Sequence, residues 1–212
     1  MEKFDYTVMR MRRRTLVLTV KGGKIEVRAP YGVSDEVIAR FIESKRGWIE
    51  SRLKERECNY PGVQDGKTLL DAGQEKPVEY GSLRNGESET GFVLKNAQSV
   101  RRYFERTRGP ILIEALYAQS VRSGLYAEDV KLCDFKARWG SCGEDRHIKL
   151  NWRLSMLPVS LRDYVLIHEL CHLKEMNHSA AFWREVQKWC PDFRECRRRL
   201  KTFGFLTLLY RQ

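Results

Sequence analysis

The residues LRDYVLIHELCHLKEMNHS, positions 161–179, decide how the rest of the chain is interpreted. Apolar residues recur through them at helical spacing, which predicts a helix. Ser160, with Asp163 three residues later, has the pattern of a capping box, so we expect the helix to begin there. The residues most able to perform chemistry lie on this helix and just beyond it.

Two histidines and a glutamate are the first candidates for a functional site. Residues four apart on a helix differ by about 40° in direction and about 6 Å in rise, so His168 and His172 lie side by side on one face. That spacing suits zinc. Glu169 projects to one flank of the pair, where it can activate a metal-bound water without becoming a ligand. The three residues together predict a hydrolytic metal site.

His178 is the candidate for a third ligand, because a catalytic zinc usually has three protein ligands and one open position. On a continuous helix His178 would point roughly 120° away from His172, so the helix must end before it. Asn177 tolerates the left-handed conformation, and we therefore expect the chain to reverse near Met176 and Asn177. Ser179 then begins another helix, whose aromatic residues pack against the first.

Two alternatives to a catalytic site stay open. His168 and His172 could be an incidental surface pair, although three of the four histidines in the chain fall within the eleven residues 168–178. The metal site could also be closed and structural, with Cys171 or the more distant Cys142 as a fourth ligand. A structural site would leave Glu169 without a role. The fourth histidine, His147, precedes a predicted strand and is interpreted as a loop residue.

Size, charge and cysteine usage limit the class of protein. A chain of 212 residues can bury a core without disulfides. It shows no signal peptide, no run of eighteen apolar residues and no Cys-x-x-Cys pair among its six cysteines, so we expect a cytoplasmic protein with reduced thiols and no membrane contact. The formal net charge of +11 favours anionic partners such as nucleic acid, nucleotides or acidic proteins.

The amino-terminal part reads as strands and a helix. Residues 15–20 and 25–29 are rich in β-branched residues and flank Gly22-Gly23, which predicts a hairpin. Helical periodicity follows over residues 34–56. Residues 59–96 are rich in glycine and contain short apolar runs, so we expect short strands joined by loops.

The carboxyl-terminal part alternates helices and strands. Residues 99–126 have helical periodicity, interrupted at Gly109-Pro110, where proline should split the helix. Residues 130–135 and 148–152 read as two strands around the loop 139–143, and we expect them to form a hairpin. The last residues predict a short helix with a basic outer face.

Several stretches match a known family. They are Arg138 to Cys142 (RWGSC), Ile148 to Leu154 (IKLNWRL), Pro158, Asp163 to Val165, His168 to Lys174, Asn177 to Ser179 and Phe182-Trp183. With these residues the chain closely resembles the YgjP-like metallopeptidase domain, and more distantly SprT-type and other gluzincin-like proteases. The specific part of the resemblance covers about residues 130 to 205.

The resemblance implies an α+β fold. Its zincin-like core, in which the active-site helix packs on a small sheet, would occupy residues 97–212, after a smaller mixed strand and helix region in residues 1–96. It also implies His168, His172 and His178 as ligands of one Zn²⁺ and Glu169 as the catalytic residue. A metzincin is disfavoured, because Glu175 replaces the expected glycine and no later methionine supplies a Met-turn.

Three functions are compatible with these residues. The first is a metallopeptidase acting on peptides or unfolded proteins, with the Ile148 strand as an edge for the substrate backbone and Arg138 and Asn151 as candidate substrate-binding residues. The second is hydrolysis of a nucleoside triphosphate at the same site, although no phosphate-binding loop is evident. The third is a nucleic-acid-binding module with a structural zinc.

Overall fold

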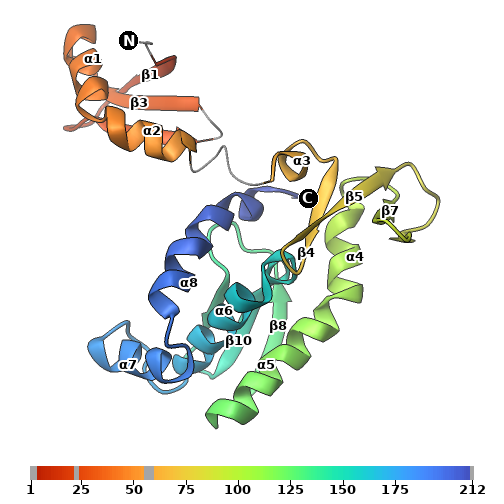
Figure 1. Cartoon of the computed structure of the whole chain (residues 1–212). Coiled ribbons are helices and arrows are strands. Elements are labelled where there is room, and N and C mark those ends of the chain that lie inside the picture. Colours follow the sequence, from red (N-terminus) through yellow and green to blue (C-terminus); the bar gives the residue numbers. More distant parts are fainter. Residues whose placement is uncertain (1–3, 22–23, 55–59, 211–212) are drawn as a thin grey trace. The chain divides into compact units, whose positions relative to one another are not determined.

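The computed structural model describes residues 4–21, 24–54 and 60–210, and its contacts divide the chain into two compact units, Met1–Asn59 and Tyr60–Gln212 (Figure 1). Each unit encloses its own group of buried apolar residues. No helix in the described ranges is both long enough and apolar enough to cross a bilayer.

The first unit is a three-stranded sheet covered by two helices. The elements are β1 (Tyr6–Met11), β2 (Val17–Lys21), β3 (Lys24–Pro30), α1 (Asp35–Ser44) and α2 (Arg46–Lys54). The central strand β3 pairs parallel with β1 and antiparallel with β2, as expected for the predicted hairpin, whose Gly22-Gly23 turn lies outside the described residues. The predicted helix over 34–56 is two helices, because it is interrupted at Lys45.

The second unit carries the remaining elements. In chain order they are α3 (Pro61–Gln64), β4 (Thr68–Asp71), β5 (Gln74–Tyr80), β6 (Gly86–Glu87), β7 (Phe92–Leu94), α4 (Ser99–Thr107), α5 (Gly109–Ser123), β8 (Asp129–Cys133), β9 (Gly140–Cys142), β10 (His147–Asn151), the 3-10 helix η1 (Trp152–Met156), α6 (Val159–Cys171), α7 (Ala180–Trp189), α8 (Phe193–Leu200) and the 3-10 helix η2 (Lys201–Leu208). This is the expected α+β architecture. The split between α4 and α5 falls at Arg108, next to Pro110, as predicted.

The sheet beneath the predicted metal helix has a different topology from the predicted hairpin. Strand β10 is central and pairs parallel with β8 and antiparallel with β9. The predicted pairing of 130–135 with 148–152 is therefore correct, but its hairpin direction is wrong. The predicted loop 139–143 contains strand β9, which forms the hairpin with β10 and occupies one edge of the sheet.

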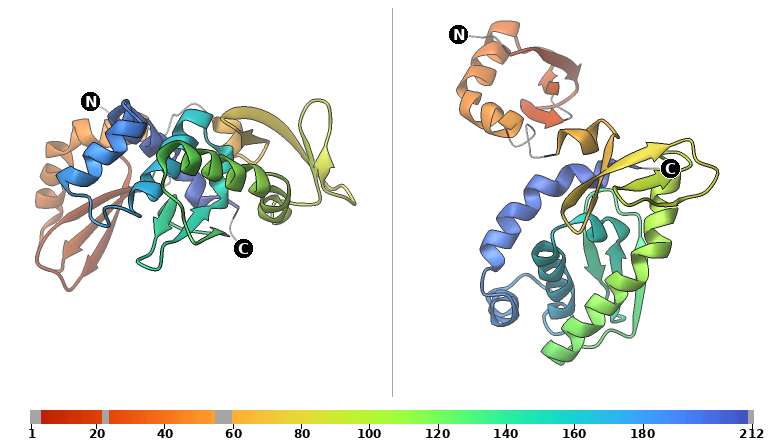
Figure 2. Two further views of the ribbon diagram at one scale, coloured as in Figure 1. Left: turned by 90° about the horizontal axis from the view of Figure 1, so that it is seen from below. Right: turned by 45° about the vertical axis from the view of Figure 1, so that its right-hand side comes forward.

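Helix α6 lies at the centre of this unit and contacts α5, α7, α8 and β9 (Figures 1 and 2). Most of its side chains are buried, which explains why it carries no polar face. The predicted capping box at Ser160 is wrong. The helix begins one residue earlier, after Pro158, whose carbonyl accepts the N–H groups of Leu161 and Arg162 at 2.9 and 3.0 Å.

The two compact units meet at residues 59 and 60, whereas the sequence suggested a boundary near residue 96. Residues 60–96 contain too few apolar side chains for a separate core, and they bury Leu69, Leu70 and Phe92 in the same cluster as the helices that follow. The N–H groups of Ala72 and Gly73 also donate to carbonyls of η1. This segment is therefore part of the unit that contains α6.

Candidate metal centre

The end of α6 brings His178 back toward the first two histidines. The helix stops at Cys171, whose carbonyl accepts the N–H groups of Lys174 and Glu175 at 3.1 and 3.0 Å, and the chain then turns. The helix thus ends before His178, as the sequence required. The reversal does not use a left-handed Asn177, however, because Asn177 has no positive φ; the N–H of Ser179 donates to its carbonyl at 2.7 Å instead.

The following helix is fixed from its first residue. Ser179 is the N-cap of α7, as predicted, and its Oγ accepts a hydrogen bond from the N–H of Phe182 at 3.3 Å. This cap sets the direction in which α7 leaves the turn. The His178 side chain, one residue before the cap, is consequently held beside α6.

Three imidazoles converge at this turn. One nitrogen from each of His168, His172 and His178 lies within 4.8 Å of the others, and the Nε2 atoms of His168 and His178 are 3.1 Å apart. His172 is buried, His168 is half-buried and His178 is exposed, so the cluster opens toward solvent on one side. The structure brings together all three histidines that the sequence singled out.

The protonation of the cluster suits a metal ligand. The ring of His172 has its Nδ1 atom 3.1 Å from the carbonyl oxygen of Glu175, so Nδ1 carries the proton and Nε2 has a free lone pair. Burial, with the charges of His172 and His178, lowers the pKa of His168 to about 3, and burial also lowers the pKa of His172. Neutral imidazoles are the form that binds divalent metals.

The donor set fits a catalytic zinc better than a structural one. Three neutral imidazole nitrogens are a common set for catalytic zinc, which keeps a further position open. Within the described ranges the cluster includes neither Cys171 nor Cys142, the two candidates for a fourth ligand. The arrangement therefore supports an open site.

Aromatic side chains hold the imidazoles in place. The ring of Phe182 stacks on His172 with centroids 4.4 Å apart, and the ring of Trp183 stacks on His178 at 5.6 Å. Both aromatic residues come from the first turn of α7, so the N-cap at Ser179 and the ring contacts act together. The sequence predicted this packing of α7 against the metal helix.

Glu169, which follows His168 on α6, lies against strand β9. Its side chain is 6% exposed, and burial raises the pKa of its carboxyl to about 8, an effect that the Arg138 guanidinium partly offsets. A Cβ on Gly140 would lie 2.7 Å from the Cγ and Oε1 of Glu169, so glycine is needed here to leave space for the carboxylate. Gly140 was not singled out as a site residue in the sequence, although it lies in the RWGSC stretch that carries the family resemblance.

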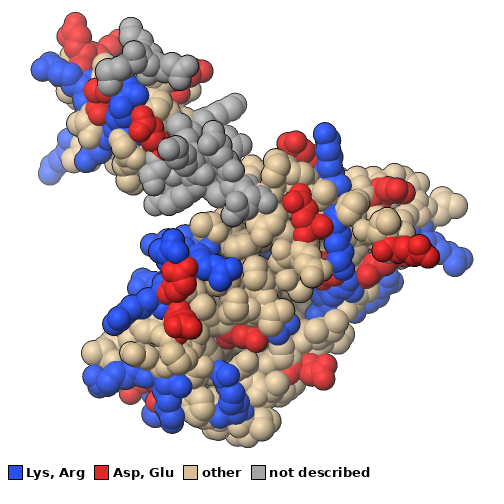
Figure 3. Space-filling model, viewed as in Figure 1, with Lys and Arg blue, Asp and Glu red and all other residues tan. Residues whose placement is uncertain are grey.

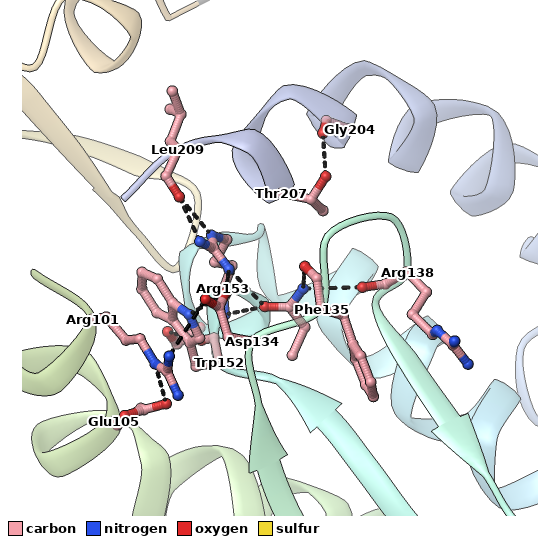
Figure 4. A network of polar contacts seen from close by, with 12 residues as sticks. Arg101, Glu105, Asp134, Phe135, Arg138, Trp152, Arg153, Gly204, Thr207 and Leu209 are labelled. Carbon is pink, nitrogen blue, oxygen red and sulfur yellow. Dashed lines mark hydrogen bonds and ion pairs between the residues drawn. The ribbon is translucent and has the colours of Figure 1, made fainter. Parts of the chain in front are cut away.

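The two predicted substrate-binding residues have different positions, and Figure 4 labels one of them, Arg138. Arg138 is exposed, packs on the ring of Phe135 at 5.0 Å and lies near Glu169, so it remains a candidate. Asn151 is completely buried, and its amide nitrogen donates to the carbonyls of Phe135 and Arg138, both at 3.0 Å. Asn151 therefore holds the loop that carries Arg138 and does not face a substrate.

Comparison with known proteins places these observations in a family. A search of curated proteins found no match. Among solved structures, the crystal structure of the metallopeptidase zymogen of Pyrococcus abyssi abylysin is similar at 29% identity, covering 43% of this chain and 92% of that chain with a TM-score of 0.40. The family model described as YgjP-like, metallopeptidase domain, matches residues 14–203. The chain therefore belongs to the YgjP-like metallopeptidase family.

Proposed function

We propose that this member of the family is a zinc peptidase in which His168, His172 and His178 hold the metal and Glu169 is the catalytic base. The observation that carries the proposal is the convergence of three imidazoles at the end of the helix that also carries the buried Glu169. Structural zinc sites use four protein ligands and have no need of an adjacent carboxylate. A hydrolase needs both an open position and a base.

Each residue has a distinct task in this proposal. When bound, zinc supplies a Lewis acid that polarises the scissile carbonyl and lowers the pKa of water. Glu169 takes the proton from the attacking water and returns it to the leaving amine. In the metal-free site burial raises the pKa of Glu169 to about 8, and a divalent cation nearby favours its ionised form, so the base is available at neutral pH when the site is loaded.

The substrate backbone is proposed to pair with β9. The prediction that the Ile148 strand provides this edge is wrong, because β10 is flanked by β8 and β9. Among the described strands β9 pairs only with β10, so its other side is an edge, and Gly140 in β9 touches Glu169. A peptide paired there would have its main chain beside the catalytic carboxylate.

The deciding experiment compares three zinc-loaded proteins: wild type, Glu169→Gln and the control Glu114→Gln, which changes an exposed carboxylate on α5. Each is assayed against unfolded β-casein and a panel of nucleoside triphosphates. We expect the wild type and the control to cleave casein, and Glu169→Gln to lose about 10²- to 10⁴-fold in rate while it keeps zinc. Equal cleavage by all three proteins would show that Glu169 is not the catalytic base.

The nucleotide panel tests the second candidate function. The exposed guanidinium of Arg138 near Glu169 is the observation that favours it, since arginine binds phosphate as well as carboxylate. If the protein hydrolyses triphosphates in a Glu169-dependent reaction and does not cleave casein, the same site acts on nucleotides and not on peptides. Zinc binding with neither activity, together with salt-dependent nucleic-acid binding, would instead support the structural zinc module.

A further inference from the structure

One arginine of the basic helix α8 contacts an aromatic ring that packs on the histidine cluster. Lys and Arg side chains gather over the part of the second unit formed by α7 and α8 (Figure 3). Arg197 follows the buried Phe193 by four residues, so the two side chains share a face of α8. The guanidinium of Arg197 lies over the ring of Trp183, 5.0 Å from its centroid.

Trp183 connects Arg197 to the histidine cluster. The indole is stacked with His178, at 5.6 Å between centroids, and with Phe193, at 5.2 Å. The charge of Arg197 is therefore separated from the third histidine by about one aromatic ring.

Arg197 has no acidic partner within the described ranges, whereas its neighbours do. Arg198, the next residue, forms an ion pair with Glu195 at 2.6 Å. Glu185, the acidic residue of α7, is bonded to Lys174 at 2.7 Å and to the indole N–H of Trp189 at 3.0 Å. The carboxylates of α7 and α8 are thus already engaged.

An unpaired guanidinium beside a metal centre has an electrostatic cost. Two cations near each other repel, so Arg197 disfavours binding of a dication by the histidines. An anionic group of the substrate bound to Arg197 would neutralise its charge and remove this repulsion. Arginine stacked on an aromatic ring is also held in an orientation that allows two parallel hydrogen bonds to a carboxylate.

We propose that Arg197 is a specificity residue that binds a carboxylate of the peptide substrate, either an acidic side chain or the free carboxyl terminus. This inference rests on the proposed peptidase function. It predicts that cleavage sites have a carboxylate at one fixed position relative to the scissile bond. Arg197 acts on the choice of substrate and not on the chemical step, so peptides without a carboxylate at that position are cleaved equally by wild type and an Arg197 variant.

The test compares the wild type with Arg197→Gln, Arg197→Lys and the matched control Arg198→Gln. Cleavage sites in unfolded β-casein are mapped by mass spectrometry. Peptide pairs are then made that differ only by Glu against Gln at each subsite, or by a free against an amidated carboxyl terminus. We expect the wild type and Arg198→Gln to favour one carboxylate by about 10- to 100-fold in kcat/KM. Arg197→Gln loses this preference, and Arg197→Lys keeps part of it.

The outcomes separate this inference from the proposal on which it rests. A preference for internal Glu identifies a side-chain carboxylate, and a preference for the free terminus identifies the terminal one; either supports the role of Arg197. Cleavage without any preference, or a preference unchanged in Arg197→Gln, overturns the inference and leaves the peptidase intact. Equal losses on charged and neutral peptides, with weakened zinc binding, would show that Arg197 only supports Trp183. If the wild type cleaves no peptide, both the proposed peptidase function and the role of Arg197 are rejected.

Discussion

Two buried polar clusters in the second unit differ in how completely their groups are bonded. Arg153 is completely buried; it bonds Asp134, the carbonyl of Leu209 and the side chain of Asn151, and its guanidinium lies 4.4 Å from the Trp152 ring (Figure 4). At the metal centre, by contrast, the buried Nδ1 of His168 has no hydrogen-bond partner in the described ranges.

The difference indicates what each cluster is for. Buried polar groups that are fully bonded define one arrangement of the chain, and here they join β10, the loop before β9 and the carboxyl-terminal segment. The Nε2 atoms of His168 and His178, by contrast, lie 3.1 Å apart, an arrangement that a bound metal ion would stabilise, and the buried Nδ1 of His168 is left without a partner at a cost to the fold. We infer that the Arg153 network stabilises the fold and that the histidine cluster binds a ligand. Four variants test this distinction.

The largest effect on stability is expected from Arg153→Met. Removal of the guanidinium leaves the Leu209 carbonyl without its partner and Asp134 with only its longer contacts to Arg101 and Trp152, and breaking a buried pair typically costs about 3–5 kcal/mol. Urea unfolding of the metal-free protein measures this cost. The control Arg101→Met removes a guanidinium from the rim of the same network and should cost less than about 1 kcal/mol. Equal costs would mean that burial of Arg153 is not what stabilises the network.

Glu169→Gln should stabilise the metal-free protein, whereas Arg153→Met should destabilise it. The pKa of Glu169 is about 8 in the folded state and near its ordinary value of 4.5 when unfolded. Below pH 4.5 both states are protonated, and the carboxyl has no effect. As pH rises from 4.5 to 8 the unfolded state ionises first, so stability falls. Glutamine removes this loss, and the variant gains roughly 2–5 kcal/mol at pH 9.

Unfolding of both metal-free proteins from pH 4 to 9 measures that gain. A difference in the free energy of unfolding between the two proteins that grows with pH confirms that the ionised carboxylate destabilises the fold. A constant gap would mean that Glu169 ionises normally in the folded protein. Loss of the gap on addition of zinc would show that the metal offsets the charge.

The same contrast explains which parts of the site could be predicted from the sequence. The convergence of the three histidines follows from helical spacing plus one turn, both of which are local, and so does the start of the next helix at Ser179. The parallel pairing of β8 with β10 and the edge position of β9 depend on hydrogen bonds between distant residues, for which the alternation in each strand gives no direction. Asn151 was misassigned for the same reason, since a polar residue in a strand does not reveal a partner in another segment.

Zinc should stabilise the protein only through the histidine cluster. At a free concentration of about 100 times Kd, a ligand that binds only the folded state adds about 2.7 kcal/mol. The exposed His178 can be replaced by alanine without opening the core, so His178→Ala should fold normally and lose the zinc-dependent rise in Tm. The control His147→Ala changes the remaining histidine, which faces Asp145, and should keep the rise. A full zinc response in His178→Ala would exclude it as a ligand.

The smallest change in stability, with a clear change in rate, is expected from Gly140→Ala. The added methyl group would lie 2.7 Å from the Cγ of Glu169, and the side chain of Glu169 can move more readily than the paired backbone of β9. Displacement of the base should lower kcat by about tenfold, while unfolding changes by less than about 1 kcal/mol. Gly204→Ala is the control, because open space surrounds that position. Unchanged kcat in Gly140→Ala would mean that the position of Glu169 against β9 does not matter for catalysis, and the contrast between scaffold and function would then apply to the histidines alone.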